Sequence, residues 1–157
     1  MGKWFAQLYD MFMMPIEKRG FHSIRKELLE NATGAVLEIG AGTGLNFPYY
    51  QHVDKVVAIE PNQTMRERAQ QRLAFSNFPI ELLEGDAQQL PYPDNTFDTI
   101  VGTLVFCTIP NPDIALREMK RVCKPDGKLL LFEHVRLSHT VFGRIQDYFS
   151  ECVMDAT

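Results

Sequence analysis

Short apolar runs alternate with helical patterns along most of the chain. From Ala35 onward, each apolar run is followed by a segment in which apolar residues recur every three or four positions. This alternation is typical of an α/β protein with a parallel sheet. The predicted strands are Ala35–Ile39, Lys55–Glu60, Ile80–Glu84, Thr99–Thr103 and Lys128–Val135.

Two of the intervening segments predict amphipathic helices with identifiable starts. Asn62 can cap the first helix, and Asn111-Pro112 is a cap and first-turn pair for the second. Pro125-Asp126-Gly127 predicts a turn before the last strand. The stripes expected to be buried are Met65, Ala69 and Leu73 in the first helix, and Ala115, Met119 and Val122 in the second.

Helical patterns also lie outside the predicted sheet. Trp4–Met14 and Ile16–Asn31 precede it, and the second of these carries an apolar stripe of Phe21, Ile24 and Leu28. The first is apolar around much of its circumference, so it must be covered on two sides, as a lid over a ligand, a membrane-surface element or a subunit contact. We expect one domain over 1–157, with a helical lid at 1–31, a core at 35–135 and a C-terminal helix at 138–157.

Composition excludes several classes of function. The 157 residues are 45% hydrophobic and 23% charged, with a net charge of −4 and no basic run, which argues against a nucleic-acid partner. Cys107, Cys123 and Cys152 are far apart, which predicts reduced thiols in a cytoplasmic protein and no metal site. No apolar run approaches 18 residues, so we expect no transmembrane span, although peripheral membrane contact stays open.

The strongest chemical signal is a glycine turn after the first predicted strand. Gly40, Gly42 and Gly44 follow an apolar run, where backbone without side chains lets a nucleotide-type ligand approach closely. A dinucleotide motif would have its third glycine at position 45, which is Leu45. Glu38 ends the apolar run, and such a carboxylate needs a donor or cationic partner, which a ligand ammonium group would supply.

Further polar residues follow the other predicted strands, whose carboxyl ends form the ligand edge of a doubly wound sheet. Glu60 lies 20 residues after Gly40, where an acid accepts hydrogen bonds from a ribose diol; the alternative is a helix-capping acid. Asp86 is suited to accept from an exocyclic base amine, or is a simple turn residue. Met65 packs on the base or belongs to the core, and Thr103 ends the fourth strand.

Five motifs in order resemble the class I S-adenosylmethionine-dependent methyltransferases, specifically the methyltransferase type 11 group that includes the menaquinone/ubiquinone C-methyltransferases. They are Val36–Gly44, Glu60–Met65, Glu84–Ala87, Leu90–Asp98 and Leu116–Gly127. The runs Leu104–Pro110 and Phe132–Arg136 are similar to lipid and thiol methyltransferases. The resemblance implies a Rossmann-like, doubly wound, mostly parallel sheet of about five strands in the order 3-2-1-4-5, with helices on both faces.

The resemblance also implies S-adenosylmethionine as cofactor, S-adenosylhomocysteine as product, and methyl transfer to a small hydrophobic acceptor such as a lipid, quinone precursor or thiol. The residues expected at the cofactor are Glu38, Gly40, Ala41, Gly42, Gly44, Glu60, Pro61, Met65, Asp86, Ala87 and Thr103. Those expected at the acceptor are Trp4, Phe5, Tyr9, Phe106 and Cys107. His134 is the candidate general base, or a polar residue at a strand terminus, and Cys107 is a pocket wall rather than a nucleophile.

The family's sheet normally ends in an antiparallel hairpin after the fifth strand. Only residues 136–157 follow that strand here, so we expect the hairpin to be missing and Leu129–Phe132 to form an apolar edge. A homo-oligomer that covers this edge is favoured over a truncated chain. Two alternative functions stay open: a cofactor-binding domain with little turnover, and an NAD-dependent oxidoreductase, which Leu45 disfavours.

Overall fold

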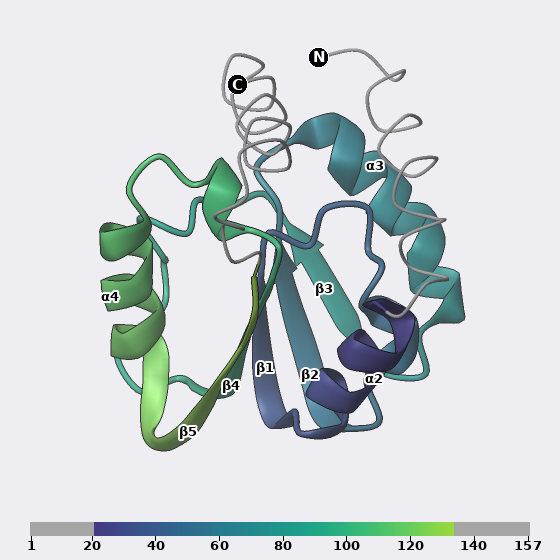
Figure 1. Ribbon diagram of the computed structural model, residues 1–157, viewed down its shortest axis with the longest axis horizontal. Coiled ribbons are helices and arrows are strands. Elements are labelled where there is room, and N and C mark those ends of the chain that lie inside the picture. The colour runs from purple at the N-terminus through teal and green to yellow at the C-terminus, as the bar shows by residue number, and fades with distance from the viewer. Residues whose placement is uncertain (1–20, 134–157) are drawn as a thin grey trace, which may run out of the picture.

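The chain folds around one parallel sheet. The structure is a computed structural model that describes residues 21–133. The sheet has the order β3-β2-β1-β4-β5, and all four neighbouring pairs are parallel (Figure 1). This confirms the predicted Rossmann-like order. The strands are β1 (Thr33–Ile39), β2 (His52–Ile59), β3 (Ile80–Leu83), β4 (Phe97–Thr103) and β5 (Cys123–Phe132).

The largest difference from the predicted strands is at the start of β5, which begins at Cys123 instead of Lys128. Pairing with β4 jumps from Phe97↔Cys123 to Thr99↔Lys128. The residues between Cys123 and Lys128 therefore bulge out of the ladder, and they include the predicted Pro125–Gly127 turn. The predicted turn before the strand is thus an irregular stretch within β5, because Cys123 already pairs with Phe97.

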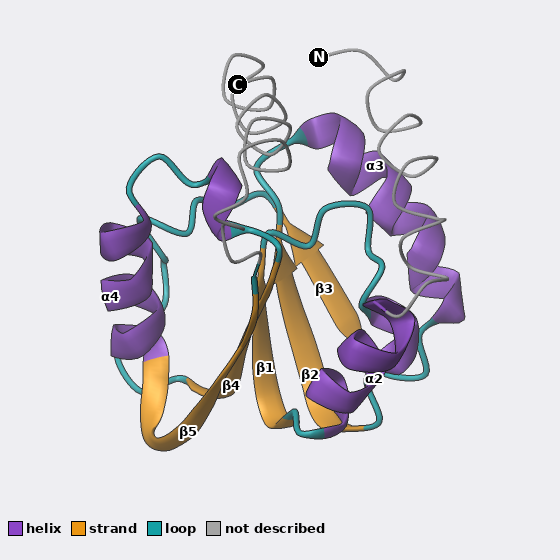
Figure 2. Ribbon diagram, viewed as in Figure 1, coloured by secondary structure: helices purple, strands orange, loops and turns teal. Residues whose placement is uncertain are grey.

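Helices cover both faces of the sheet, as the resemblance implied. The longer ones are α2 (His22–Glu30), α3 (Gln63–Arg72) and α4 (Pro112–Val122); α2 and α3 lie on one side of the sheet and α4 on the other (Figure 2). Single turns of 3-10 helix add η2 (Phe47–Tyr49), η3 (Leu73–Phe75) and η4 (Phe106–Thr108).

Two apolar cores follow from the alternation of strand side chains. Leu37 and Ile100 belong to the core on the α4 face, whereas their neighbours Val36 and Val101 belong to the core on the α2 and α3 face. A central strand buried on both sides must be apolar at successive positions. That requirement explains the continuous apolar runs that predicted these strands.

Both helices predicted between the strands form, but α3 ends before Leu73, which lies in η3 and is only half-buried. The Asn62 side chain accepts a hydrogen bond from Met65 N at 3.1 Å and so caps α3. Pro112 occupies the first turn of α4, although the Asn111 side chain makes no capping bond. The expected stripe of α4, Ala115, Met119 and Val122, is fully buried.

The predicted stripe on the helix before the sheet is wrong. Ile24 is 44% exposed, whereas Arg25 and Leu29 are the buried residues of α2. Arg25 can be buried because its side chain donates hydrogen bonds to Asn46 and to Thr103 at the end of β4. The helix predicted at Trp4–Met14 and the C-terminal helix lie outside the described residues.

Two strands form the edges of the described sheet. β5 is one of them, and Leu129 and Leu131 on it are exposed, as expected for an apolar edge. The oligomer expected to cover this edge stays a prediction. No helix within residues 21–133 is both long enough and apolar enough to cross a membrane.

Candidate functional site

The glycine turn lies at the carboxyl ends of the strands, between β1 and β2. Gly40, Gly42 and Gly44 all have positive φ, at 64°, 55° and 80°. A Cβ at Gly40 would collide with Val105, but a Cβ at Gly42 would meet no atom within 4 Å. The space beside Gly42 is therefore open, and a ligand can approach the backbone there.

Glu60 joins the end of β2 to this turn. Its two carboxylate oxygens accept hydrogen bonds from Gly42 N and Asn62 N, each at 2.9 Å, and the residue is only 8% exposed. Burial raises the pKa of Glu60, while the two backbone donors and nearby Arg66 oppose that shift. These bonds join Glu60 to the N-cap residue of α3 and to the glycine turn, and each oxygen keeps capacity for a further donor.

The segment after β3 carries the residues expected at a base. Asp86 is exposed and accepts a hydrogen bond from Gln88 N at 2.8 Å, so it forms a local turn of its own. Ala87 is buried in the core on the α4 face. Met65 is buried at the start of α3, while Pro61 is exposed. The assignment of Asp86, Ala87 and Met65 to a base, and of Pro61 to the cofactor, stays a prediction.

Glu38 finds its hydrogen-bond partners within the chain. It is 1% exposed, and its oxygens accept from Asn46 Nδ2 at 2.8 Å and Tyr50 Oη at 2.7 Å. Burial raises the pKa of Glu38 to about 7, although both donors and the charge of Arg25 oppose the rise. The buried carboxylate thus does not depend on a ligand ammonium group for a partner.

The same network reaches α2 and the end of β4. Arg25 Nη1 donates to Asn46 Oδ1 at 2.5 Å and to Thr103 Oγ1 at 3.1 Å, and Asn46 Nδ2 also reaches Thr103 Oγ1 at 3.1 Å. One polar cluster therefore ties β1, the glycine turn, β4 and α2 together. Arg25, Asn46 and Tyr50 were not predicted as site residues, because no motif singles them out.

The loop after β4 departs from ordinary backbone geometry. Leu104 has a φ of 57°, a conformation that a leucine rarely adopts and that is frequent near functional sites. Glu133, just after β5, accepts a hydrogen bond from Val105 N at 2.9 Å and so fixes this loop. Phe106 is half-buried and Cys107 is exposed in the short helix that follows.

The chemistry of Cys107 favours the neutral thiol. Partial desolvation of its side chain, together with the neighbouring Glu133 carboxylate, raises the pKa of this thiol. A protonated thiol is a poor nucleophile at neutral pH, which supports the interpretation of Cys107 as a wall. The other residues predicted at the acceptor, Trp4, Phe5 and Tyr9, and the candidate base His134 lie outside the described residues.

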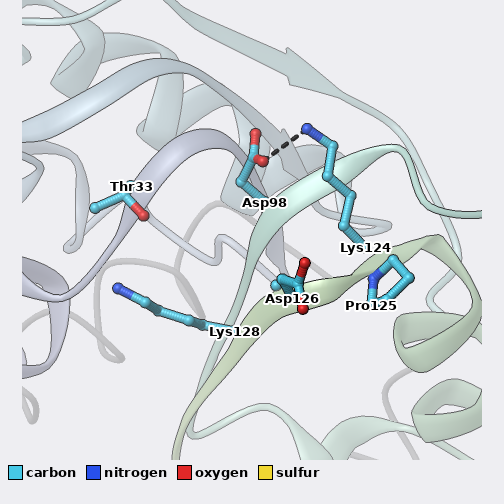
Figure 3. Close-up of a pocket in the computed structure, with 7 residues that line it drawn as sticks. Thr33, Asp98, Lys124, Pro125, Asp126 and Lys128 are labelled. Carbon is cyan, nitrogen blue, oxygen red and sulfur yellow. Dashed lines mark hydrogen bonds and ion pairs between the residues drawn. The ribbon is translucent and has the colours of Figure 1, made fainter.

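A second polar region lies at the opposite end of the strands. Figure 3 shows it, lined by Thr33, Asp98, Lys124, Pro125, Asp126, Gly127 and Lys128. Asp98 accepts from Lys124 Nζ at 2.6 Å and from Ala35 N at 2.9 Å, and the Lys124 hydrogen bond is the main reason why the pKa of Asp98 is lowered. These contacts join the starts of β1 and β4 to the bulge in β5.

Comparisons with known proteins agree with the geometry. A family model described as "Methyltransferase domain" matches residues 37–131. The chain is 38% identical over 103 residues to a phosphatidylethanolamine N-methyltransferase of Cereibacter sphaeroides, covering 64% of this chain and 51% of that protein. It is 33% identical over 158 residues to the ubiquinone/menaquinone biosynthesis C-methyltransferase UbiE of Shewanella oneidensis, covering 92% of this chain and 62% of that protein.

The fold is also found among solved structures. A putative methyltransferase from Bacillus halodurans superposes with a TM-score of 0.70 at 24% identity, over 82% of this chain and 58% of that chain. The present chain thus spans between half and two thirds of the curated relatives described above. Together, these matches confirm the resemblance drawn from the five sequence motifs.

Proposed function

The chain belongs to the methyltransferase domain family, and from this we propose that it binds S-adenosylmethionine and transfers the methyl group to a small hydrophobic acceptor. S-adenosylmethionine is the cofactor of this family, as expected from the sequence. The observation that carries the proposal is the pairing of an open backbone at Gly42 with the Glu60 carboxylate bonded to it.

The described residues fit such a cofactor. The space beside Gly42 is free of protein atoms, so a ligand can lie against the backbone there. A side chain at position 42 would take up part of that space. Glu60 presents acceptors to the two hydroxyls of a ribose, and exposed Asp86 presents acceptors to a base amine. Thr103 belongs to the buried Glu38 cluster through its hydrogen bond from Asn46, and we place the amino-acid end of the cofactor beside this cluster.

The bound cofactor supplies an activated methyl group and its own leaving group, so the protein needs to orient the acceptor and exclude water. Positioning of this kind can account for about 7–11 kcal/mol of a barrier. The loop from Leu104 to Phe106, to which Glu133 is hydrogen-bonded, is suited to form one wall of such a site. We assign Phe106 and Cys107 to that wall, and His134 as the base if the acceptor carries a proton.

The acceptor is proposed from two kinds of support. The pocket residues predicted from the sequence are apolar or aromatic, and the two curated relatives are named for a phospholipid and for quinone biosynthesis. A lipid, a quinone precursor or a thiol is therefore our proposed acceptor class. We also propose a cytoplasmic location, which is supported by the free thiols of Cys107 and Cys123.

Transfer of a labelled methyl group tests the proposal. The full chain is incubated with methyl-labelled S-adenosylmethionine and a panel of phospholipid, quinone-precursor, thiol and amine acceptors. We expect label in at least one hydrophobic acceptor and loss of that transfer in Glu60→Gln, but not in Glu30→Gln, whose side chain is 47% exposed on α2. Binding of S-adenosylhomocysteine without any transfer would instead favour the cofactor-binding domain, and binding of NAD alone would contradict the proposal.

A further inference from the structure

Arg66 connects two strand ends that flank the proposed cofactor site. It lies on the first turns of α3, and its side chain is 18% exposed. Nη1 donates to the carbonyl oxygens of Glu60 and Pro61, each at 2.7 Å, and Nη2 donates to Glu84 Oε2 at 2.7 Å. One guanidinium group thus bonds to the segment after β2 and to the segment after β3.

Both of these segments carry proposed cofactor contacts. The Glu60 carbonyl belongs to the residue whose carboxylate faces the glycine turn, and Glu84 lies two positions before Asp86. Arg66 also has its own backbone tied to this corner, because Arg66 N donates to Asn62 O at 3.0 Å. None of the five sequence motifs assigns a role to this arginine.

An arginine suits this position better than a lysine. Three acceptors surround it in different directions, and the planar guanidinium presents several donors at fixed angles, whereas an ammonium group is a single point charge. The positive charge also lies near the buried Glu60 carboxylate and favours its ionised form. Arg66 therefore acts on both the backbone and the charge of Glu60.

We propose that Arg66 is a positioning residue that holds Glu60 and the Glu84–Ala87 segment in the geometry that recognises the ribose of the cofactor. The inference rests on the proposed function, since it assumes that Glu60 binds the ribose hydroxyls. Arg66 itself touches no reacting atom. Its effect is transmitted through the Glu60 and Pro61 carbonyl groups and through the Glu84 carboxylate.

The preference for an intact ribose over a deoxyribose separates the two possible roles of Arg66, because a residue that only stabilises the fold would not change that preference. The full chain is titrated with S-adenosylhomocysteine and with its 2′-deoxy and 3′-deoxy analogues, and the ratio of dissociation constants is compared between variants. The variants are Arg66→Met and Arg66→Lys, the second in case the first folds poorly, with Glu84→Gln to isolate the exposed pair. Arg117→Met is the matched control, because Arg117 is exposed on α4 and donates to Asp113 O in its own helix.

We expect the wild type to bind S-adenosylhomocysteine about tenfold or more tightly than either deoxy analogue, because each analogue lacks one hydroxyl that can donate to the charged Glu60 carboxylate. Arg66→Met should lose most of that preference, Arg66→Lys and Glu84→Gln should each retain part of it, and Arg117→Met should keep it in full. If the wild type discriminates but both Arg66 variants keep the full ratio, the inference is wrong while the proposed function stands. If the wild type binds none of the compounds or does not discriminate between them, the Glu60 assignment itself fails.

Discussion

Gly42→Ala separates the binding role of the glycine turn from its role in folding. A Cβ at Gly42 meets no atom within 4 Å, so the added methyl group displaces nothing in the protein. The backbone there has a φ of 55°, which an alanine adopts only with strain. We therefore expect a stability loss from backbone strain alone, together with a methyl group in the space proposed for the cofactor.

The magnitudes follow from that geometry. A left-handed conformation costs an L-residue about 1–2 kcal/mol, which lowers the melting temperature of a chain of this size by about 2–8 °C. Gly40→Ala is the contrasting variant, because its Cβ would also collide with Val105 and overpacking adds about 1–3 kcal/mol. Gly42→Ala should thus be the more stable of the two variants.

Thermal unfolding and calorimetric titration with S-adenosylhomocysteine measure the two effects on the same samples. We expect Gly42→Ala to remain folded and to bind at least about tenfold more weakly than wild type, which corresponds to about 1.4 kcal/mol. Wild-type affinity in a folded Gly42→Ala protein would refute the placement of the cofactor against this turn.

Three further predictions concern the polar groups around the turn. Burial raises the pKa of Glu38 from its ordinary value of 4.5 to about 7, so the free energy of unfolding should fall by about 3 kcal/mol as pH rises from 4.5 to 7. Urea unfolding across that range should show this decrease in wild type and not in Glu38→Gln. Tyr50→Phe removes a 2.7 Å hydrogen bond to the buried carboxylate and should lower the free energy of unfolding by about 1.5–3 kcal/mol at pH 8, and an unchanged urea midpoint would contradict it. Because the raised pKa keeps the Cys107 thiol protonated, Cys107→Ser should retain methyl transfer in the labelling assay, and complete loss would identify a reactive sulfur.

The fold was predictable because the three inner strands β1, β2 and β4 contain runs of residues buried on both faces of the sheet. Successive apolar residues such as Val36 and Leu37 face opposite cores, so a continuous apolar run indicated a central parallel strand. The start of β5 was less predictable, because the Pro125–Gly127 turn hides the pairing of Cys123 with Phe97. Sequence patterns report burial well, but they do not report a register jump between distant segments.

The candidate site was predictable where single residues carry a local requirement. Gly42 has a positive φ, and Glu60 follows a buried strand and comes 20 residues after Gly40. Both features can be recognised from the sequence, so both residues were named as candidates. Arg25 and Asn46 were missed because their partners lie far away in the sequence, with Arg25 bonded to Thr103 across 78 positions. The apolar stripe expected on α2 was wrong for the same reason: a distant polar cluster, and not the helix itself, decides which side chain is buried.

The most direct test of cofactor binding at the glycine turn is the affinity of Glu60→Gln for S-adenosylhomocysteine, measured by calorimetry beside wild type and Glu30→Gln, which changes an exposed carboxylate on α2. Glutamine keeps the shape of Glu60 but loses one of the two acceptors that bond to Gly42 N and Asn62 N and the charge that faces the ribose. We expect the wild type and Glu30→Gln to bind alike and Glu60→Gln to bind at least about tenfold more weakly. Equal affinity of all three proteins would contradict this expectation.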